Sequence, residues 1–260
     1  MTTLSNDRKP SRVTLIVAPA VLGVALIALW QATVSLFHIP VYFVPAPRGI
    51  WDALIDQHGP IASATRVTGW NALRGLIVGA IAGLAGALIA HSVPFLRDMA
   101  APIVVAFSVV PIVALGPVLY ALFGGQFHTA RVIVAAISVA VPVYITTLRG
   151  LKQVLPVHRD LMHAYSVSAR RSTTLVTLPT AAPYAFTGLR IGSSLAVISA
   201  LITEYFGGPG EGLGIGIRNS ATSGRIALAW AYVLGSIVLG LIFYVVTYAV
   251  ERLAGRHRAA

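Results

Sequence analysis

The chain contains no cysteine and carries very little charge. Without cysteine, neither a disulfide framework nor a thiolate metal site is available. Only 10% of the 260 residues are charged, against about 25% in ordinary globular proteins. Hydrophobic residues make up 57% of the sequence. This composition excludes an ordinary soluble domain and is typical of a membrane protein.

Signals for nucleotide, metal or hydrolytic chemistry are also missing. The phosphate-binding pattern GxxxxGK[ST] requires a glycine before lysine, and neither Lys9 nor Lys152, the only lysines, has one. The glycine-rich run at residues 207–216 lacks GxGxxG spacing and follows an apolar span, which favours a tight re-entrant turn. The seven histidines form no HExxH pattern, and no GxSxG is present. We therefore expect no cofactor, metal or enzymatic activity on this chain.

The positive charge has a membrane interpretation. The 19 basic residues outnumber the 8 acidic ones, which in a soluble protein would indicate a nucleic-acid partner. Here the basic residues lie between apolar stretches, where they orient a chain in the bilayer. We therefore expect the chain to lie in a lipid bilayer and not to bind nucleic acid.

Six apolar stretches are predicted to cross the bilayer, which requires about 20 apolar residues each. The first follows Arg8, Lys9 and Arg12 but is much longer than the roughly 7 to 15 apolar residues of a signal peptide, so we expect it to be retained. The fold class is therefore all-α, a single polytopic domain over residues 1–260. The predicted spans are Val13–Phe37, Trp70–Val93, Met99–Phe123, Val132–Leu148, Phe186–Phe206 and Ile226–Val250.

The distribution of basic residues predicts the orientation. With six spans both termini share a side, and 13 of the 19 basic residues fall on that side. Lys and Arg are enriched in cytoplasmic loops, so both termini are predicted to be cytoplasmic in a bacterial inner membrane. The basic residues predicted outside are Arg48, Arg66, Arg74, Arg131, Arg218 and Arg225.

Local patterns add detail. Residues 38–69 are too polar to span, but "IWDALID" within them has helical spacing and predicts a short helix at the outer surface. Gly75, Gly79 and Gly83 form one smooth helix face, for which packing within one subunit is favoured over a dimer contact. Prolines 102, 111 and 117 interrupt the third span. Broken helices often line a transport pathway, and ordinary kinks are at least as common.

One polar stretch stands out, "HRDLMHAYSVSARR" at residues 158–171. It predicts a short amphipathic helix with Leu161, Met162 and Tyr165 near one face. Such a helix docks into a groove on a partner or lies on the lipid surface, and periodicity alone favours the lipid surface.

The run that begins within this stretch, at Asp160, and continues through "LPTAAPYAFTGLRIG" resembles a known signature. Permease subunits of binding-protein-dependent ABC importers carry EAA-x3-G-x9-[IV]-x-LP in a cytoplasmic loop. Aligned on Leu178 and Pro179, Asp160 stands at the glutamate and Ser166 at the glycine, while Leu161 and Met162 replace the alanines. The second half, which includes Pro183, Gly188 and Arg190, is close to the pattern.

The likeness extends from "VPAPRGIWDAL" to "TEYFGGPGEGLGIGI". Over this range the chain is similar to the nitrate, sulfonate and taurine permease group. Within it, "DLMHAY" is similar to the branch for thiamine-precursor pyrimidines and riboflavin. The resemblance implies a type I importer permease, a homodimer served by two ATPase subunits that bind ATP and Mg²⁺, and by an extracytoplasmic solute-binding protein. A sulfonate, taurine or nitrate importer is the alternative substrate class; a secondary transporter or channel and a membrane-embedded enzyme are the rival functions.

The resemblance also implies roles for single residues. The loop at about 150–186 would carry a coupling helix seated on the ATPase, built from Asp160, Leu161, Met162, Tyr165, Ser166 and Arg170. Asp160 would lie in the first turn of that helix, where the dipole favours an acid. Leu178, Pro179, Pro183 and Gly188 would shape the signature loop.

Glu204 is the only acidic residue within the predicted spans, which marks it as a functional candidate. Its predicted position is toward the outer leaflet. One interpretation is that it caps the glycine-rich turn, with Gly212 and Gly214, by accepting backbone hydrogen bonds, and this is favoured over substrate contact. The sharper hypothesis is an outer gate held through that turn or through Arg218.

Overall fold

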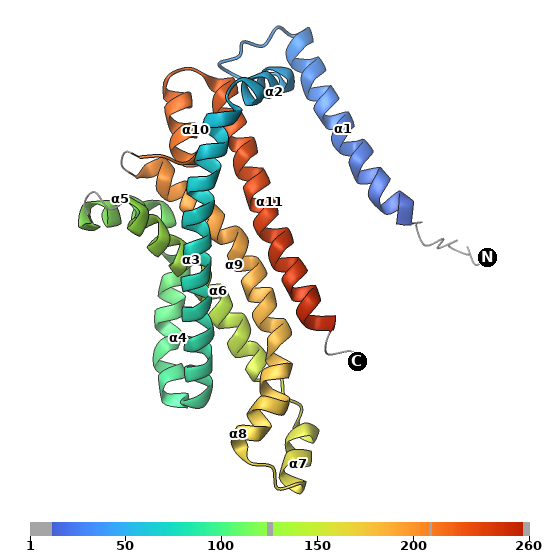
Figure 1. Cartoon of the computed structure of the whole chain (residues 1–260), viewed down its shortest axis with the longest axis vertical. Coiled ribbons are helices and arrows are strands. Elements are labelled where there is room, and N and C mark those ends of the chain that lie inside the picture. The colour runs from blue at the N-terminus through green and yellow to red at the C-terminus, as the bar shows by residue number, and fades with distance from the viewer. Residues whose placement is uncertain (1–11, 124–126, 208–209, 257–260) are drawn as a thin grey trace, which may run out of the picture.

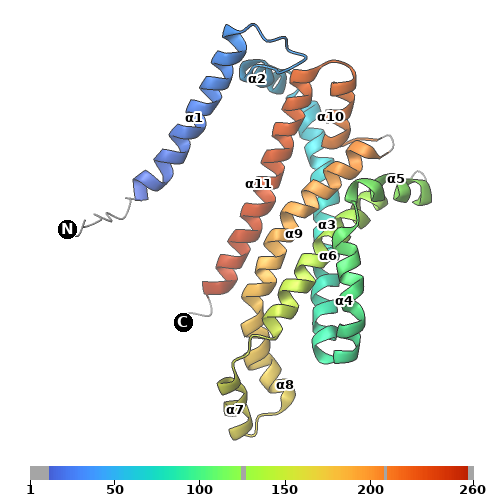
Figure 2. The same ribbon diagram turned by 180° about the vertical axis from the view of Figure 1, so that it is seen from behind.

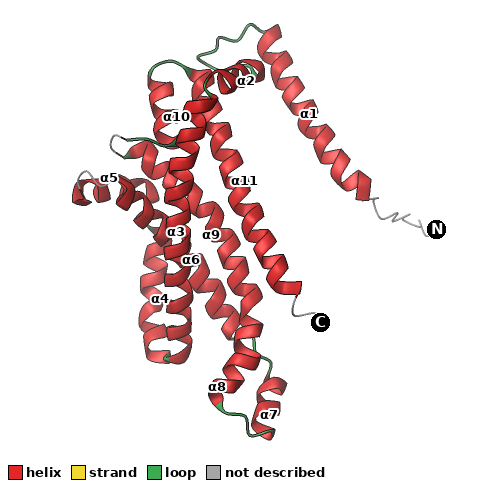
Figure 3. Cartoon of the chain, in the orientation of Figure 1, coloured by secondary structure: helices red, strands yellow, loops and turns green. Residues whose placement is uncertain are grey.

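A computed structural model describes residues 12–123, 127–207 and 210–256, where all regular structure is helical (Figure 3). The helices in chain order are α1 (Arg12–Leu36), α2 (Pro47–Asp56), α3 (His58–Ser92), α4 (Pro94–Val109), α5 (Ile112–Phe123), α6 (Phe127–Leu151), α7 (Pro156–Ala164), α8 (Ala169–Ser172), the π-helical turn η1 (Thr173–Thr177), α9 (Leu178–Phe206), α10 (Leu213–Thr222) and α11 (Ile226–Arg256).

Five of the six predicted spans are confirmed as single helices, in the predicted order, and the remaining one corresponds to a bent pair of helices. In the described part of the chain, α1, α3, α6, α11 and the continuous α8–α9 helix are long and apolar enough to cross a bilayer, and the bent pair α4–α5 is the sixth candidate. The boundaries differ most at two spans: the continuous α8–α9 helix begins at Ala169, well before the predicted start at Phe186, and α3 begins at His58, so residues 58–69, predicted not to span, are helical. Pro60 does not prevent this, because proline is tolerated in a first helical turn.

The centre of the bundle is formed by α6, with α3 and α9 packed along it. The glycine stripe of α3 makes this possible. A Cβ atom built on Gly79 would lie 2.7 Å from Val139 Cβ, and one on Gly83 would lie 2.7 Å from the Ala140 carbonyl oxygen. Only glycine permits such a close approach between two helices. The stripe therefore serves packing within one subunit, as predicted.

The third span is broken at Pro111. Helices α4 and α5 meet at an angle of 96°, and α5 turns away from the direction of α4 (Figure 1). Proline lacks the N–H of the helical ladder and its ring clashes with the preceding turn. Pro102 and Pro117 lie inside α4 and α5, so only one of the three predicted interruptions ends a helix.

The two ends of the bundle carry different elements. We call the end with α2 and α10 the α10 end, and the end with α7 and α8 the α7 end (Figure 1). The predicted short helix is present as α2 at the α10 end. Figure 2 shows α1 leaning away from the bundle, which it meets at α2 and through an edge-on contact of Trp30 with Trp230. The start of α1 and the end of α11 both point toward the α7 end.

Candidate functional site

The polar stretch at the α7 end is a helical hairpin and not the single helix predicted for residues 158–171. Helix α7 ends at Ala164, and the chain turns through Tyr165 and Ser166 before α8 begins at Ala169. The N–H of Ser166 donates to the His163 carbonyl at 2.9 Å, and that of Val167 to Met162 at 2.9 Å. Ser166 has φ of 52°, in the left-handed region that favours glycine. This explains why the signature has glycine at that position.

Three apolar side chains spaced by four residues point outward from α7. Val157, Leu161 and Tyr165 are 68%, 47% and 73% exposed. Met162, predicted to belong to this face, is half-buried. It lines a cavity with Val176 and Pro179, and Leu161 lines the same cavity but remains exposed. The exposed set is therefore Val157, Leu161 and Tyr165, which we call the α7 face.

The other signature residues shape the hairpin and its connection to the bundle. Asp160 is the fifth residue of α7 and lies beyond the first turn, so the expected dipole contact is wrong because the helix already starts at Pro156. Arg170 is exposed on α8, and Leu178 and Pro179 begin α9. Farther along α9, Pro183 lies inside the helix, and Gly188 is buried where a Cβ would lie 2.9 Å from Val143 Cα of α6.

Near the α10 end, Glu204 is fully buried and bonded to three elements. Its Oε2 accepts hydrogen bonds from Thr68 Oγ1 at 2.8 Å and from the Gly214 N–H at 3.1 Å. The Thr68 hydroxyl in turn accepts the N–H of Leu213 at 2.9 Å. Both donated N–H groups belong to the first turn of α10, where an acid is electrostatically favoured. The expected cap contact is therefore present, with α10 as the helix that is capped.

The ion partner of Glu204 is Arg131, which the sequence analysis had placed in an outer loop. Arg131 is 1% exposed on α6, and its Nη1 lies 3.6 Å from Glu204 Oε1. It also donates from Nε to the Tyr120 hydroxyl at 2.9 Å and from Nη1 to the Glu211 carbonyl at 2.8 Å. Its position one residue before a predicted span was the available signal, since an arginine at that depth requires a partner.

Arg218, the predicted gate partner, does not reach Glu204. Its Nη1 donates to the carbonyls of Tyr205 and Gly207 at 3.2 and 2.8 Å. Gly212, with φ of 142°, precedes α10 at a point where a Cβ would collide with the Glu204 carboxyl group. Arg131 and Glu204 together thus hold the segment Gly210–Gly214, which we call the outer loop after the side predicted for it from the sequence.

Two further acidic residues lie just outside the predicted spans but within the helices of the structure, because α4 begins before the predicted Met99 and α11 ends after the predicted Val250. Asp98 is exposed on α4 beside Arg97. Glu251 lies on α11, and its Oε2 is 3.3 Å from Arg190 Nη1 of α9. Glu204 is therefore not the only acid in the candidate spans, although it is the one with a completely buried side chain.

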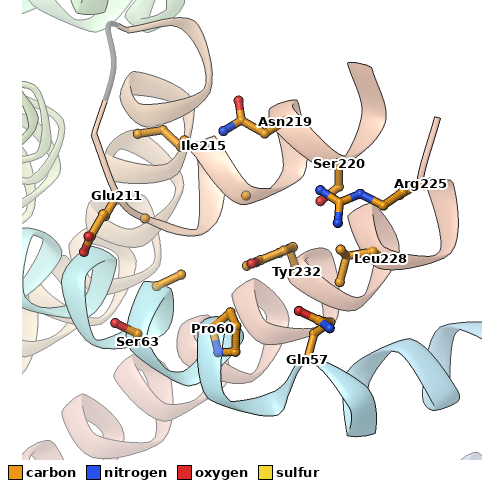
Figure 4. A pocket seen from close by; sticks show the side chains of 13 residues that line it. Gln57, Pro60, Ser63, Glu211, Ile215, Asn219, Ser220, Arg225, Leu228 and Tyr232 are labelled. Carbon is orange, nitrogen blue, oxygen red and sulfur yellow. The ribbon is translucent and has the colours of Figure 1, made fainter. Parts of the chain in front are cut away.

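A polar cavity of about 370 Å³ adjoins the outer loop between α3, α10 and α11 (Figure 4). Gln57, Asn219, Arg225 and Tyr232 line it together with Glu211, the residue whose carbonyl binds Arg131. No group of three or more histidine, cysteine and acidic side chains in the described ranges is placed to hold a metal ion. The residues around the cavity are suited to hydrogen bonding with a solute or with a protein surface.

Comparison with known proteins identifies the relatives of this arrangement. The pattern of the family described as "Binding-protein-dependent transport system inner membrane component" matches residues 75–256, which include the hairpin, Arg131 and Glu204, while Thr68 lies before this range. The riboflavin transport system permease protein of Chloroflexus aurantiacus is 30% identical over 242 residues, covering 90% of this chain and 88% of the relative.

Two more relatives cover most of the chain. A probable ABC transporter permease protein of Haemophilus influenzae is 28% identical over 229 residues, covering 87% of this chain and 91% of the relative. The formylaminopyrimidine transport permease protein of Halalkalibacterium halodurans is 26% identical over 211 residues, covering 78% and 81%.

Proposed function

Because the chain belongs to the family of binding-protein-dependent transport system inner membrane components, and so is a multi-pass ABC transporter permease of the inner membrane, we propose that it forms the pathway of an ATP-driven importer. In this proposal two copies of the chain pair with two ATP-binding cassette subunits, which bind ATP and Mg²⁺, and a solute-binding protein delivers the solute from outside. The family match across the hairpin, Arg131 and Glu204 is the observation that carries the proposal.

The hairpin is the part of the chain suited to transmit movement. It is inserted between the end of α6 and the start of α9, so a force on α7 and α8 acts on two central helices at once. Helix α9 has 29 residues and spans about 43 Å at 1.5 Å per residue. Glu204 lies near its far end. A partner that moves the hairpin can thereby act on the outer loop.

The outer loop is suited to act as a gate. Arg131 and Glu204 hold it against α3 and α6 through the contacts described above. Docking of the binding protein at the α10 end would release these contacts, and the solute would then pass. This assignment keeps Glu204, Gly212 and Gly214 in the gate and replaces Arg218 by Arg131.

Reconstitution tests the proposal. The purified chain in liposomes with its ATPase should take up solute only when ATP and the loaded binding protein are both supplied. The same liposomes without the ATPase are the control, and uptake in them would establish a secondary transporter or channel. Catalytic turnover of a solute by the chain alone would favour a membrane enzyme.

The orientation proposal places the α7 end in the cytoplasm. The chain has no cysteine, so single cysteines report cleanly. A cysteine replacing exposed Ser223, after α10, should react with an impermeant thiol reagent in intact cells, whereas one replacing exposed Ser168, before α8, should react only after permeabilisation. If only the Ser168→Cys variant is labelled in intact cells, the α7 end lies outside and the proposed orientation is wrong.

The preferred solute is a small heteroaromatic vitamin or its precursor, either riboflavin or a thiamine-precursor pyrimidine. The names of the two relatives from Chloroflexus and Halalkalibacterium support this preference. The alternative is a sulfonate, taurine or nitrate. Because the binding protein selects the solute in such systems, binding measurements on the cognate binding protein decide between them, and a sulfonate ligand without pyrimidine or flavin affinity would overturn the preference.

A further inference from the structure

A basic site lies on the exposed face of α3, apart from the Glu204 site. Arg66, Trp70 and Arg74 are exposed and spaced by four residues, so they form one stripe. Together with Val67, Asn71 and His128 they line a cavity of about 530 Å³, a size that accommodates a small ligand or a lipid headgroup. The guanidinium carbon of Arg74 lies 5.2 Å from the centre of the Trp70 ring, which holds this cation over the aromatic face.

The charge of this site is not compensated within the subunit. Among the described residues, the ion pairs are those of Arg97, Arg131 and Arg190, and neither Arg66 nor Arg74 takes part in one. Two arginines that converge on a cavity without an acid favour an oxyanion, and a guanidinium group binds a phosphate in bidentate fashion. Asn71 and His128 add a polar wall, joined by a 3.1 Å hydrogen bond between His128 Nδ1 and Asn71 Oδ1.

The surface beside the site indicates the source of the oxyanion. Along α3 toward the α7 end, the exposed face continues as Ile77, Val78 and Ile81. A polar, cationic and aromatic stripe thus changes into an apolar one within two helical turns. Tryptophan and arginine at the membrane–water boundary contact lipid headgroups, while the apolar residues beyond them contact acyl chains. A free anion would use the arginines but would not require the apolar continuation.

We propose that the cavity between Arg66, Trp70, Arg74 and His128 binds the phosphate headgroup of an anionic phospholipid whose acyl chains lie along Ile77, Val78 and Ile81. The site adjoins the gate, because Asn71 lies on α3 within one turn of Thr68, the residue that binds both Glu204 and the N–H of Leu213. The lipid therefore stabilises the same stretch of α3 that anchors the outer loop. This site is independent of the solute and of the ATPase.

Thermal unfolding of the purified full chain in a neutral detergent tests the proposal. Short-chain phosphatidylglycerol should raise Tm in a saturable manner, whereas equal concentrations of phosphatidylcholine or inorganic phosphate should not. In Arg66→Gln/Arg74→Gln the apparent affinity should fall roughly 30-fold, since each surface arginine contributes about fivefold toward an anionic lipid. The matched control is Arg48→Gln, which removes another exposed arginine near the α10 end and should bind like the parent.

Three results would overturn the proposal. The first is an equal rise in Tm with phosphatidylcholine. The second is a rise in Tm with inorganic phosphate alone, which would assign the site to a free anion. The third is unchanged lipid affinity in the Arg66→Gln/Arg74→Gln variant. If the double variant does not fold, each single variant should show the fivefold loss, and unchanged affinity in both would have the same consequence. All measurements use the chain without its transport partners, so failure of the proposed import function would leave this result standing.

Discussion

Replacement of Arg131 by methionine should destabilise the protein by about 3–5 kcal/mol, which is the cost of leaving one member of a buried ion pair without its partner. The side chain is 1% exposed and Glu204 is 0% exposed, so water cannot replace the lost guanidinium. The Tyr120 hydroxyl and the Glu211 carbonyl lose a donor in addition. Thermal unfolding in detergent should show the loss as a lowered Tm.

A double-mutant cycle makes this prediction specific to the pair. Glu204→Met should also destabilise strongly, and Arg131→Met/Glu204→Met should lose clearly less than the sum of the two single variants, because neither charge is then left alone. Arg48→Met, which removes an exposed arginine on α2, is the matched control and should melt like the parent. Additive losses, or a parent-like Tm for Arg131→Met, would show that the pair does not hold the outer loop.

The milder variant Glu204→Gln distinguishes a cap from a gate. Glutamine retains an oxygen that can accept the hydrogen bonds of Thr68 and Gly214, but it removes the attraction to Arg131. A role limited to capping α10 predicts nearly normal transport. A gating role predicts ATP hydrolysis that no longer depends on the loaded binding protein, in a protein that still folds. Normal transport with unchanged ATPase stimulation would remove Glu204 from the gate.

The spans could be predicted because the bilayer imposes a length on every apolar helix. The same criterion could not locate the start of α3, since residues 58–69 continue the helix outside the apolar region, where hydropathy carries no signal. Helix α7 is a similar case. Its spacing predicted the exposed Leu161 and Tyr165. The chain reversal at Ser166 depends on a left-handed backbone conformation, for which a serine gives no signal in the sequence. The glycine that the resembling signature has at this position was the available signal, and the single helix predicted through residues 158–171 did not use it.

The surroundings of Glu204 were predicted in part. Glu204 could be recognised from its own properties, because an acid inside an apolar span is costly and needs a partner. The identity of that partner depends on how α6, α9 and α3 are aligned when packed, and this alignment is set by the glycine contacts between helices. Arg218 is closer in sequence and was therefore chosen, whereas packing brings Arg131 to the carboxylate. Thr68 lay in a segment read as loop and could not be considered.

The α7 face leads to the second large effect, the loss of ATPase association on introduction of a charge. Tyr165 and Leu161 are exposed in the single chain, so Tyr165→Asp or Leu161→Asp should leave the membrane bundle folded. In the proposed assembly the same side chains enter an apolar groove of the ATPase. Burying an unpaired carboxylate there costs several kcal/mol, roughly enough to abolish a modest interface. Co-purification of the ATPase with each variant should therefore fall to background.

An aspartate placed elsewhere in the hairpin tests whether the loss of ATPase association depends on the position of the new charge. Ser168→Asp introduces the same charge at the exposed residue preceding α8, where an aspartate is a favoured helix cap, and it should retain the ATPase. Met162→Asp should behave differently, because Met162 is half-buried between α7 and η1 and its replacement should also lower Tm. The α7 face is the docking surface only if Tyr165→Asp and Leu161→Asp lose the ATPase at an unchanged Tm while Ser168→Asp keeps it. Normal co-purification of the ATPase with Tyr165→Asp and Leu161→Asp would assign docking to another part of the α7 end.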